Sequence, residues 1–181
     1  MNLFKKAVRK LSFCFFTVLS KLKWGDSLNI SGLFQRLADT QIIILNGGRI
    51  NIGANVSFQK RVSLTSGGVL NIGSDVAFNR NCILVCRNNI TIGSNTMFGP
   101  GVTIYDHDHK FNADGIQSEL NYGSVIIDNG CWIAANVTIL RNTHIGEGSV
   151  IGAGTVVKGE IPPHSLVTSD RGLNIVPIRK A

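Results

Sequence analysis

Gly47-Gly48-Arg49-Ile50-Asn51-Ile52-Gly53 returns twenty residues later as Gly67-Gly68-Val69-Leu70-Asn71-Ile72-Gly73, and a third time as Asn88-Asn89-Ile90-Thr91-Ile92-Gly93. Inside each unit a bulky apolar residue recurs at every sixth position. The series is Ile52, Phe58, Leu64, Ile72, Phe78, Leu84, Ile92, Phe98 and Ile104, and later Ile127, Ile133, Ile139, Ile145, Ile151 and Val157. A small or β-branched residue follows most of these by four positions, as at Val56, Val76, Thr96, Val137, Thr143, Ser149 and Thr155. A fixed internal period of this kind is typical of a solenoid.

A period of six fits neither the 3.6-residue period of an α-helix nor the alternation of a simple strand. It fits a chain that runs straight for a few residues, turns a corner and repeats, so that three sixes close one triangular coil. The bulky residues then point inward, and glycine, asparagine and aspartate at the corners supply the positive φ angles of tight turns. The sequence therefore predicts an all-β fold, a parallel β-helix of hexapeptide repeats.

The repeat is interrupted once. The sixes stop after Ile104 and resume at Ile127, and the segment between them holds two of the four histidines, His107 and His109. Long insertions in compact domains are uncommon and often functional, and an imidazole can accept a proton near neutral pH. We therefore predict an active-site loop over residues 105–126.

The N-terminal segment differs from the rest of the chain. The net charge is +7, but residues 1–24 hold six basic and no acidic side chains, which leaves +1 for residues 25–181. The folded domain over 25–181 is thus nearly neutral, and we expect no nucleic-acid partner. Apolar residues at steps of three and four predict an amphipathic α-helix over residues 1–24.

The partner of this helix stays open between an anionic membrane surface and a protein surface, either the domain itself or a neighbouring subunit. The apolar run over residues 11–19 is too short for a transmembrane helix and lacks a signal-peptide cleavage site. Four cysteines without paired spacing fit a reducing compartment. We expect a cytoplasmic protein, with peripheral contact to the inner face of the plasma membrane if the helix binds lipid.

The pattern over about residues 30–161 resembles the hexapeptide-repeat acyltransferases. The stretch over residues 95–163 looks closest to the maltose and galactoside O-acetyltransferases and their relatives in polysaccharide gene clusters. The resemblance implies a left-handed β-helix, a homotrimer, acetyl-CoA as donor and no metal. It also implies a sugar hydroxyl as acceptor, on a small-molecule or lipid-linked sugar, in the biosynthesis of a surface polysaccharide.

The same resemblance implies site residues. An Ile-Tyr pair, a histidine four residues after that tyrosine and a closing Leu-x-Tyr-Gly match Ile104-Tyr105, His109 and Leu120-Asn121-Tyr122-Gly123, so His109 is the expected catalytic base. His107 would orient His109, bind the acceptor or be idle. Flanking Asp106 and Asp108 could raise the basicity of either imidazole. Tyr105 and Asp108 are further candidates for contacting the acceptor.

Other positions are carried over one by one. Asn81 matches an acceptor-binding asparagine, although it would also suit a turn. Trp132 matches a tryptophan that borders the acyl site, although it would also suit a subunit contact. Ala135 and Ala153 match positions along the pantetheine arm of the coenzyme. The cations available for its phosphates are Arg141, Lys158, Arg179 and Lys180, and here the resemblance weakens at Lys158-Gly159 and over residues 168–172.

Three alternatives compete with this interpretation. A zinc centre like that of the γ-class carbonic anhydrases needs three histidines from two subunits, but His144 and His164 lie in other coils than the loop histidines. A non-catalytic scaffold would leave the histidine-bearing loop unexplained. The sugar-nucleotide N-acyltransferases usually add a nucleotide-binding domain, for which 181 residues with a 24-residue tail leave no room.

Overall fold

The computed structural model describes residues 22–32, 36–37, 39–45 and 47–169. Residues 22–24 are helical and lead into the 3₁₀ turn η1 (Gly25–Ser27), so most of the predicted amphipathic helix lies outside the described residues. Within those ranges, no helix is long and apolar enough to cross a bilayer. Nearly everything after η1 is built from short strands.

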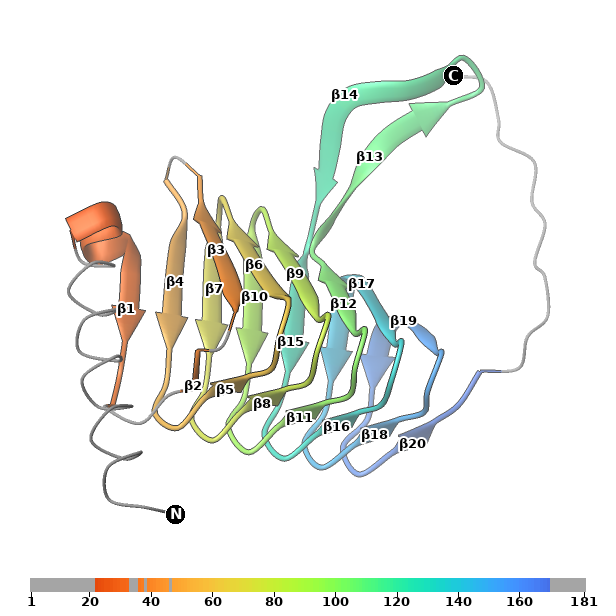
Figure 1. Ribbon diagram of the computed structural model, residues 1–181. Helices are drawn as coiled ribbons and strands as arrows, with labels where there is room; N and C mark the ends of the chain where they lie inside the picture. The colour runs from red at the N-terminus through yellow and green to blue at the C-terminus, as the bar shows by residue number, and fades with distance from the viewer. Residues whose placement is uncertain (1–21, 33–35, 38, 46, 170–181) are drawn as a thin grey trace, which may run out of the picture.

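The strands stack into three flat faces of a parallel β-helix (Figure 1). The β4 face contains β1 (Leu28–Ile30), β4 (Arg49–Ile52), β7 (Val69–Ile72), β10 (Asn89–Ile92), β15 (Ser124–Ile127) and the second half of β17 (Thr138–Ile145). The β5 face contains β2 (Arg36–Leu37), β5 (Ser57–Phe58), β8 (Ala77–Phe78), β11 (Met97–Phe98), β16 (Trp132–Ile133), β18 (Val150–Ile151) and β20 (Leu166–Val167). The β6 face contains β3 (Thr40–Ile44), β6 (Val62–Ser66), β9 (Ile83–Cys86), β12 (Thr103–Tyr105) and the first halves of β17 and β19 (Val156–Ile161). The second half of β19 continues the β4 face.

The register between coils reproduces the sequence repeat. Leu70 of β7 pairs with Ile50 of β4 on one side and with Ile90 of β10 on the other, at the twenty-residue period. After the interruption, Val125 pairs with Thr143 and Ile139 with Val157, eighteen residues on in both cases. Each early coil is two residues longer than each later coil, and the extra residues lie at the corner between the β6 and β4 faces. In the later coils, β17 and β19 bend around that corner as continuous strands.

The inward positions predicted from the sixes form the core. Every bulky residue of the series is buried, and so are the small residues that follow them. Phe58, Phe78 and Phe98 stack coil upon coil, with ring centroids 5.2 and 4.5 Å apart. Cys82, Cys86 and Cys131 are also buried, and burial raises the pKa of the Cys82 thiol to about 11 and that of Cys86 to about 12. These three thiols therefore fill the core.

The corners carry the turn residues that the sequence predicts. Positive φ angles occur at stacked positions such as Asn55, Asp75 and Asn95, and at Asn81 and Asn136. Gly68 has a different reason to be glycine, because a Cβ there would lie 2.2 Å from the carbonyl oxygen of Asn88 in the next coil. Close stacking of the backbones thus selects small residues at this corner.

The interruption, predicted as a loop over residues 105–126, is an ordered hairpin. Strands β13 (His107–Asn112) and β14 (Gly115–Tyr122) pair in antiparallel fashion and project from the corner between the β6 and β4 faces (Figure 1). Tyr105 still belongs to β12, and residues 124–126 already belong to β15. In the turn, the Asn112 side chain accepts a hydrogen bond from the N–H of Asp114, and Gly115 has φ 125°. We call this corner of the solenoid the hairpin corner.

Candidate active site

Asp106 anchors the base of the hairpin. It follows Ser66 and Cys86 in one inward column at the twenty-residue period, and its side chain is fully buried. Its carboxylate accepts hydrogen bonds from the N–H groups of Arg87, at 2.8 and 3.0 Å, and Asn88, at 2.7 Å. One coil earlier, Gly67, the counterpart of Arg87, donates to the carbonyl of Cys86 in the following coil. Because the chain leaves the solenoid after Tyr105, the carboxylate replaces the missing carbonyls.

The same carboxylate orients His107. The Nδ1 atom of His107 lies 3.0 Å from Oδ1 of Asp106, and the His107 side chain is only 14% exposed. Tyr105 contacts the imidazole edge-on, with ring centroids 6.5 Å apart. Because a carboxylate only accepts hydrogen bonds, Nδ1–H is the donor in this contact, and Nε2 is the ring nitrogen that Asp106 does not engage.

Asp108 ties the hairpin to the next coil. It accepts hydrogen bonds from Nε of Arg141 at 2.6 Å and from Nδ2 of Asn121 at 3.0 Å. Burial acts to raise the pKa of Asp108, but the hydrogen bonds from Arg141 and Asn121 and the charges of Arg141 and Lys158 hold that pKa below its usual value. Asp108 and Arg141, expected to contact the acceptor and the coenzyme respectively, are therefore bound to each other, and Lys158 lies within their electrostatic reach.

His109 is the exposed histidine of the hairpin. It lies opposite Leu120 of β14 and, two residues after His107 in an extended strand, on the same face of β13. In the described part of the chain its imidazole makes no hydrogen bond, whereas that of His107 is oriented by Asp106. The hairpin thus presents one oriented and one unrestrained imidazole on a common face.

The remaining candidates lie at a different corner. Asn81, with φ 62°, Ala135 and Ala153 lie in turns between the β5 and β6 faces, and Trp132 lies on the adjoining β5 face with 51% of its surface exposed. We call this the Asn81 corner. The β6 face separates it from the hairpin corner, and six extended residues span roughly 20 Å. The structure therefore brings the candidates together in two groups and does not join the groups within one chain.

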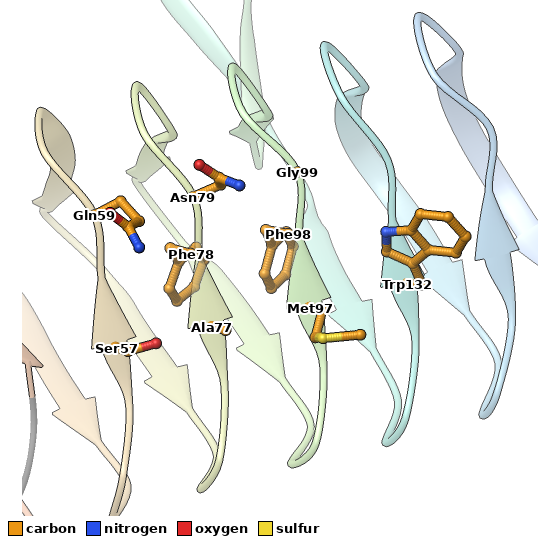
Figure 2. A pocket seen from close by; sticks show the side chains of 9 residues that line it. All are labelled: Ser57, Gln59, Ala77, Phe78, Asn79, Met97, Phe98, Gly99 and Trp132. Carbon is orange, nitrogen blue, oxygen red and sulfur yellow. The ribbon is translucent and has the colours of Figure 1, made fainter. Parts of the chain in front are cut away.

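A hollow of about 230 Å³ lies on the β5 face beside the Asn81 corner (Figure 2). Trp132 and Met97 stand at one end of it, and the amide side chains of Gln59 and Asn79 stand on successive coils toward the other. Its remaining lining is Ser57, Ala77, Phe78, Phe98 and Gly99. Gln59, Asn79 and Met97 were not among the residues predicted from the sequence. Their outward positions beside the buried phenylalanines, next to small Ala77 and Gly99, are the signal that points to them.

His144 takes no part in either group. Its Nε2 lies 3.0 Å from a carboxylate oxygen of Asp128 and its Nδ1 lies 3.0 Å from one of Glu160, so both ring nitrogens face carboxylates. The hydrogen bond with Asp128 is the main reason that the pKa of His144 is raised. Across the residues that the structure describes, no three histidine, cysteine or acidic side chains are grouped so as to hold a metal ion.

The later coils match a known family pattern. The profile of the bacterial transferase hexapeptide (six repeats) matches residues 124–159. The chain carries the bacterial transferase hexapeptide repeat. The resemblance inferred from the sixes is thereby confirmed, and the matched residues run from β15 to β19, immediately after the hairpin.

Among curated proteins, this hexapeptide-repeat protein is 40% identical over 67 residues to the galactoside O-acetyltransferase of Lactococcus lactis. That match covers 36% of the chain and 32% of the relative. The chain thus spans less than half the length of the first curated relatives that it matches.

Solved structures show the same fold. A variant of AntD, an N-acyltransferase from Bacillus cereus, in complex with dTDP and coenzyme A is similar with a TM-score of 0.72 at 21% identity, covering 91% of this chain and 89% of that one. A hexapeptide-repeat-containing acetyltransferase from Vibrio cholerae, complexed with acetyl-CoA, has a TM-score of 0.57 at 21% identity over 88% of this chain and 78% of that one. The fold is a left-handed parallel β-helix, as expected.

The AntD likeness corrects one argument from length. The match covers 89% of the chain of AntD, an N-acyltransferase in complex with dTDP, and 91% of this chain. An N-acyltransferase of this kind therefore needs a chain of only about this length. The short chain therefore does not separate N-acyltransferases from O-acyltransferases.

Proposed function

We propose that this protein is an acyltransferase that moves the acetyl group of acetyl-CoA to a sugar hydroxyl. The observation that carries the proposal is the β13–β14 hairpin, which leaves a hexapeptide-repeat β-helix at one corner and presents two histidines on one strand face. The similarity to a galactoside O-acetyltransferase supports the sugar acceptor. A role in making a surface polysaccharide, and a donor of acetyl rather than a longer acyl group, rest on the resemblance of the sequence alone.

The chemistry needs one proton acceptor and no covalent enzyme intermediate. The acceptor oxygen attacks the thioester carbonyl carbon while its proton passes to an imidazole nitrogen. The tetrahedral oxyanion is stabilised by backbone N–H groups and collapses with cleavage of the C–S bond. The departing thiolate takes the proton from the imidazolium, which gives an O-acetyl sugar and coenzyme A. We assign His109 as the base, and His107, oriented by Asp106, as its neighbour in the site.

We propose that the site forms between two copies of a homotrimer. The hairpin corner of one copy supplies the imidazoles, and the Asn81 corner of another supplies Asn81 and Trp132 for the acceptor. The pantetheine arm runs along Ala135 and Ala153. Because Arg141 is bound to Asp108, Lys158 is the exposed cation that we assign to a coenzyme phosphate.

Calorimetric titration with acetyl-CoA tests the proposal, with coenzyme A and zinc as parallel arms. We expect saturable acetyl-CoA binding near one site per chain. We then expect acetyl transfer to hydroxyls in a panel of sugars that includes amino sugars. Zinc binding without thioester binding would contradict the proposal, and transfer to the amine of an amino sugar would make the enzyme an N-acetyltransferase.

His109→Ala tests the assigned base. We expect it to lower kcat by at least about a hundredfold, because general base catalysis contributes on that scale, while acetyl-CoA binds with little change. Gln117→Ala, an exposed position on β14, serves as the matched control for the integrity of the hairpin. Turnover at the wild-type rate in His109→Ala would remove this residue from the mechanism.

A further inference from the structure

We propose that the acceptor is a sugar that carries a phosphate or diphosphate ester, and that Lys60 and Arg80 bind that phosphate beside the hollow on the β5 face. This inference rests on the proposed function and names the chemical class of its acceptor. It combines two separate observations, the lining of the hollow and the charge of the corner next to it.

The hollow suits one sugar ring. Its volume of about 230 Å³ lies below that of sites for drug-sized ligands. The exposed indole of Trp132 offers an apolar surface to the ring, and the amides of Gln59 and Asn79 can exchange hydrogen bonds with hydroxyls (Figure 2). The Oδ1 atom of Asn79 accepts the N–H of Arg80 at 2.8 Å, so its Nδ2 remains to donate to a ligand. None of the nine residues that line the hollow carries a charge.

The charge lies immediately outside the hollow. Lys60 directly follows Gln59, and Arg80 directly follows Asn79, at equivalent positions of adjacent coils, where the N–H of Asn81 donates to the carbonyl of Lys60 at 3.1 Å. Both cations are exposed, and neither makes an ion pair within the part of the chain that the structure describes.

The surroundings leave this part of the corner positive. Arg61, also exposed, follows Lys60, and its N–H donates to the carbonyl of Asp39 in the preceding turn at 3.1 Å, which places one acidic residue beside three basic ones. In the later coils the counterparts of Lys60 and Arg80 are Pro100, Ala135 and Ala153, which are uncharged. The positive charge is therefore confined to the coils at the amide end of the hollow, away from Trp132.

A phosphate ester matches this arrangement. With the sugar ring against Trp132 and its hydroxyls on the amides, a substituent that leaves the ring toward Gln59 and Asn79 reaches two adjacent cations. Charge-assisted hydrogen bonds to phosphate are about twice as strong as neutral ones, and arginine can form two in parallel. A phosphate would thus fix which sugar hydroxyl faces the donor. The shared chemistry is the phosphate ester, whether it links the sugar to a nucleotide or to a lipid.

The test compares acceptors that differ only in the phosphate. Acetyl transfer is measured with N-acetylglucosamine, its 1-phosphate, its UDP ester and its farnesyl diphosphate ester, and the same series is run with glucose and galactose. We expect kcat/KM to be at least tenfold higher for the phosphorylated members of a series. A preference for the UDP ester indicates a nucleotide sugar, and a preference for the farnesyl ester indicates a lipid-linked sugar.

The variant Lys60→Gln/Arg80→Gln removes both cations. We expect it to raise KM for the phosphorylated acceptor at least tenfold and to leave KM for the free sugar and for acetyl-CoA unchanged. Arg49→Gln, an exposed arginine on the β4 face, is the matched control and should change none of these values. Equal kcat/KM for free and phosphorylated sugars would overturn the proposal, and so would a rise in KM for acetyl-CoA in the double variant.

A binding measurement separates this inference from the proposed function. The sugar 1-phosphates are titrated into the protein without acetyl-CoA. Binding that is lost in Lys60→Gln/Arg80→Gln supports the phosphate site even where no acetyl transfer is seen, in which case the transferase proposal fails alone. Transfer to free sugars, with no binding of any phosphorylated member, overturns the phosphate site alone.

Discussion

At the scale of single residues, Asp106 joins the stability of the fold to the geometry of the site. Its carboxylate satisfies two backbone N–H groups that lose their partners when the chain leaves the solenoid, and the same carboxylate holds Nδ1 of His107. The orientation of the imidazole is therefore set by a group that is needed for structural reasons.

Substitution of Asp106 should reduce stability and orientation together. We expect Asp106→Ala to lower the free energy of unfolding by about 2–4 kcal/mol, because the buried N–H groups of Arg87 and Asn88 lose a charged acceptor. Asp106→Asn, which keeps one acceptor oxygen, should lose less. Urea denaturation measures both variants. An unfolding midpoint for Asp106→Ala equal to that of the wild type would show that these hydrogen bonds do not stabilise the fold.

The sequence alone predicts the inward position of Asp106 but not its hydrogen bonds. The position of Asp106, twenty residues after Cys86 and forty after Ser66, already marks it as an inward position of the repeat. Its hydrogen-bond partners are backbone groups of the previous coil, and no side-chain pattern reports on those. For the same reason the sequence could name both His107 and His109 but could not tell which imidazole is oriented.

At the scale of elements, the coils after the hairpin carry an ionic ladder across three adjacent strand ends. Asp128 follows β15, His144 lies in β17 and Glu160 lies in β19, and the imidazole is hydrogen-bonded between the two carboxylates. This ladder crosses the coils that follow the hairpin and links their outer surfaces.

The ladder should make stability depend on pH. The hydrogen bond with Asp128, together with the charges of both carboxylates, raises the pKa of His144 in the folded state. The stabilisation is therefore fully present below about pH 6.5, the ordinary histidine pKa. It is lost as the pH rises through the higher value of the folded protein. We expect His144→Gln to lower Tm by about 1–3 °C at pH 5.5, a modest effect because the imidazole is partly exposed.

Thermal unfolding at pH 5.5 and pH 9 measures this difference. The gap in Tm between the wild type and His144→Gln should narrow at the higher pH. Asp128→Asn should abolish most of the pH dependence, since Asp128 makes the largest contribution to the shift. A gap of the same size at both pH values would show that the ladder carries no proton-linked stability.

The coils themselves were predictable almost residue by residue, whereas the hairpin was not. The bulky apolar residues at steps of six form a column of buried side chains, and burial is the property that a hydrophobic sequence pattern reflects. The hairpin residues are mostly exposed, and Phe111 and Ile116, which pair across it near the turn, are 61% and 81% exposed. The pattern there carries no inward column, so only the turn at residues 112–115 hinted at paired strands.

At the scale of the whole molecule, the candidate residues lie at two corners separated by the β6 face. Each group has its own neighbours: Asp106, Arg87 and Asn88 at the hairpin corner, and the hollow with its flanking cations at the Asn81 corner. A repeat pattern fixes the height of each residue along the solenoid but says little about which corners face each other in an assembly. The sequence therefore could not show that the candidate residues lie at two separate corners.

Co-expression of two inactive variants tests the proposed assembly. We expect His109→Ala and Trp132→Ala each to be nearly inactive alone. When the two chains mix in one homotrimer, about a quarter of the sites between neighbouring copies would combine an intact hairpin with an intact Trp132. Activity should recover to about that fraction. A mixture as inactive as its components, in trimers shown by light scattering to contain both chains, would place the whole site within one chain.

The insertion of the hairpin leaves the stacking on either side undisturbed. Ile90 of β10 pairs with Val125 of β15 in the same register that Leu70 and Ile90 keep without an insertion, although thirty-five residues separate the pair. The two ends of the inserted segment are thus fixed by the solenoid, and the entropic penalty of lengthening such a segment grows only slowly. The hairpin corner is therefore a suitable position at which to exchange the inserted segment. Exchanging residues 107–122 for the corresponding segment of another solenoid protein, with Asp106 and Gly123 kept in place, would transfer the inserted hairpin without redesigning the scaffold beneath it.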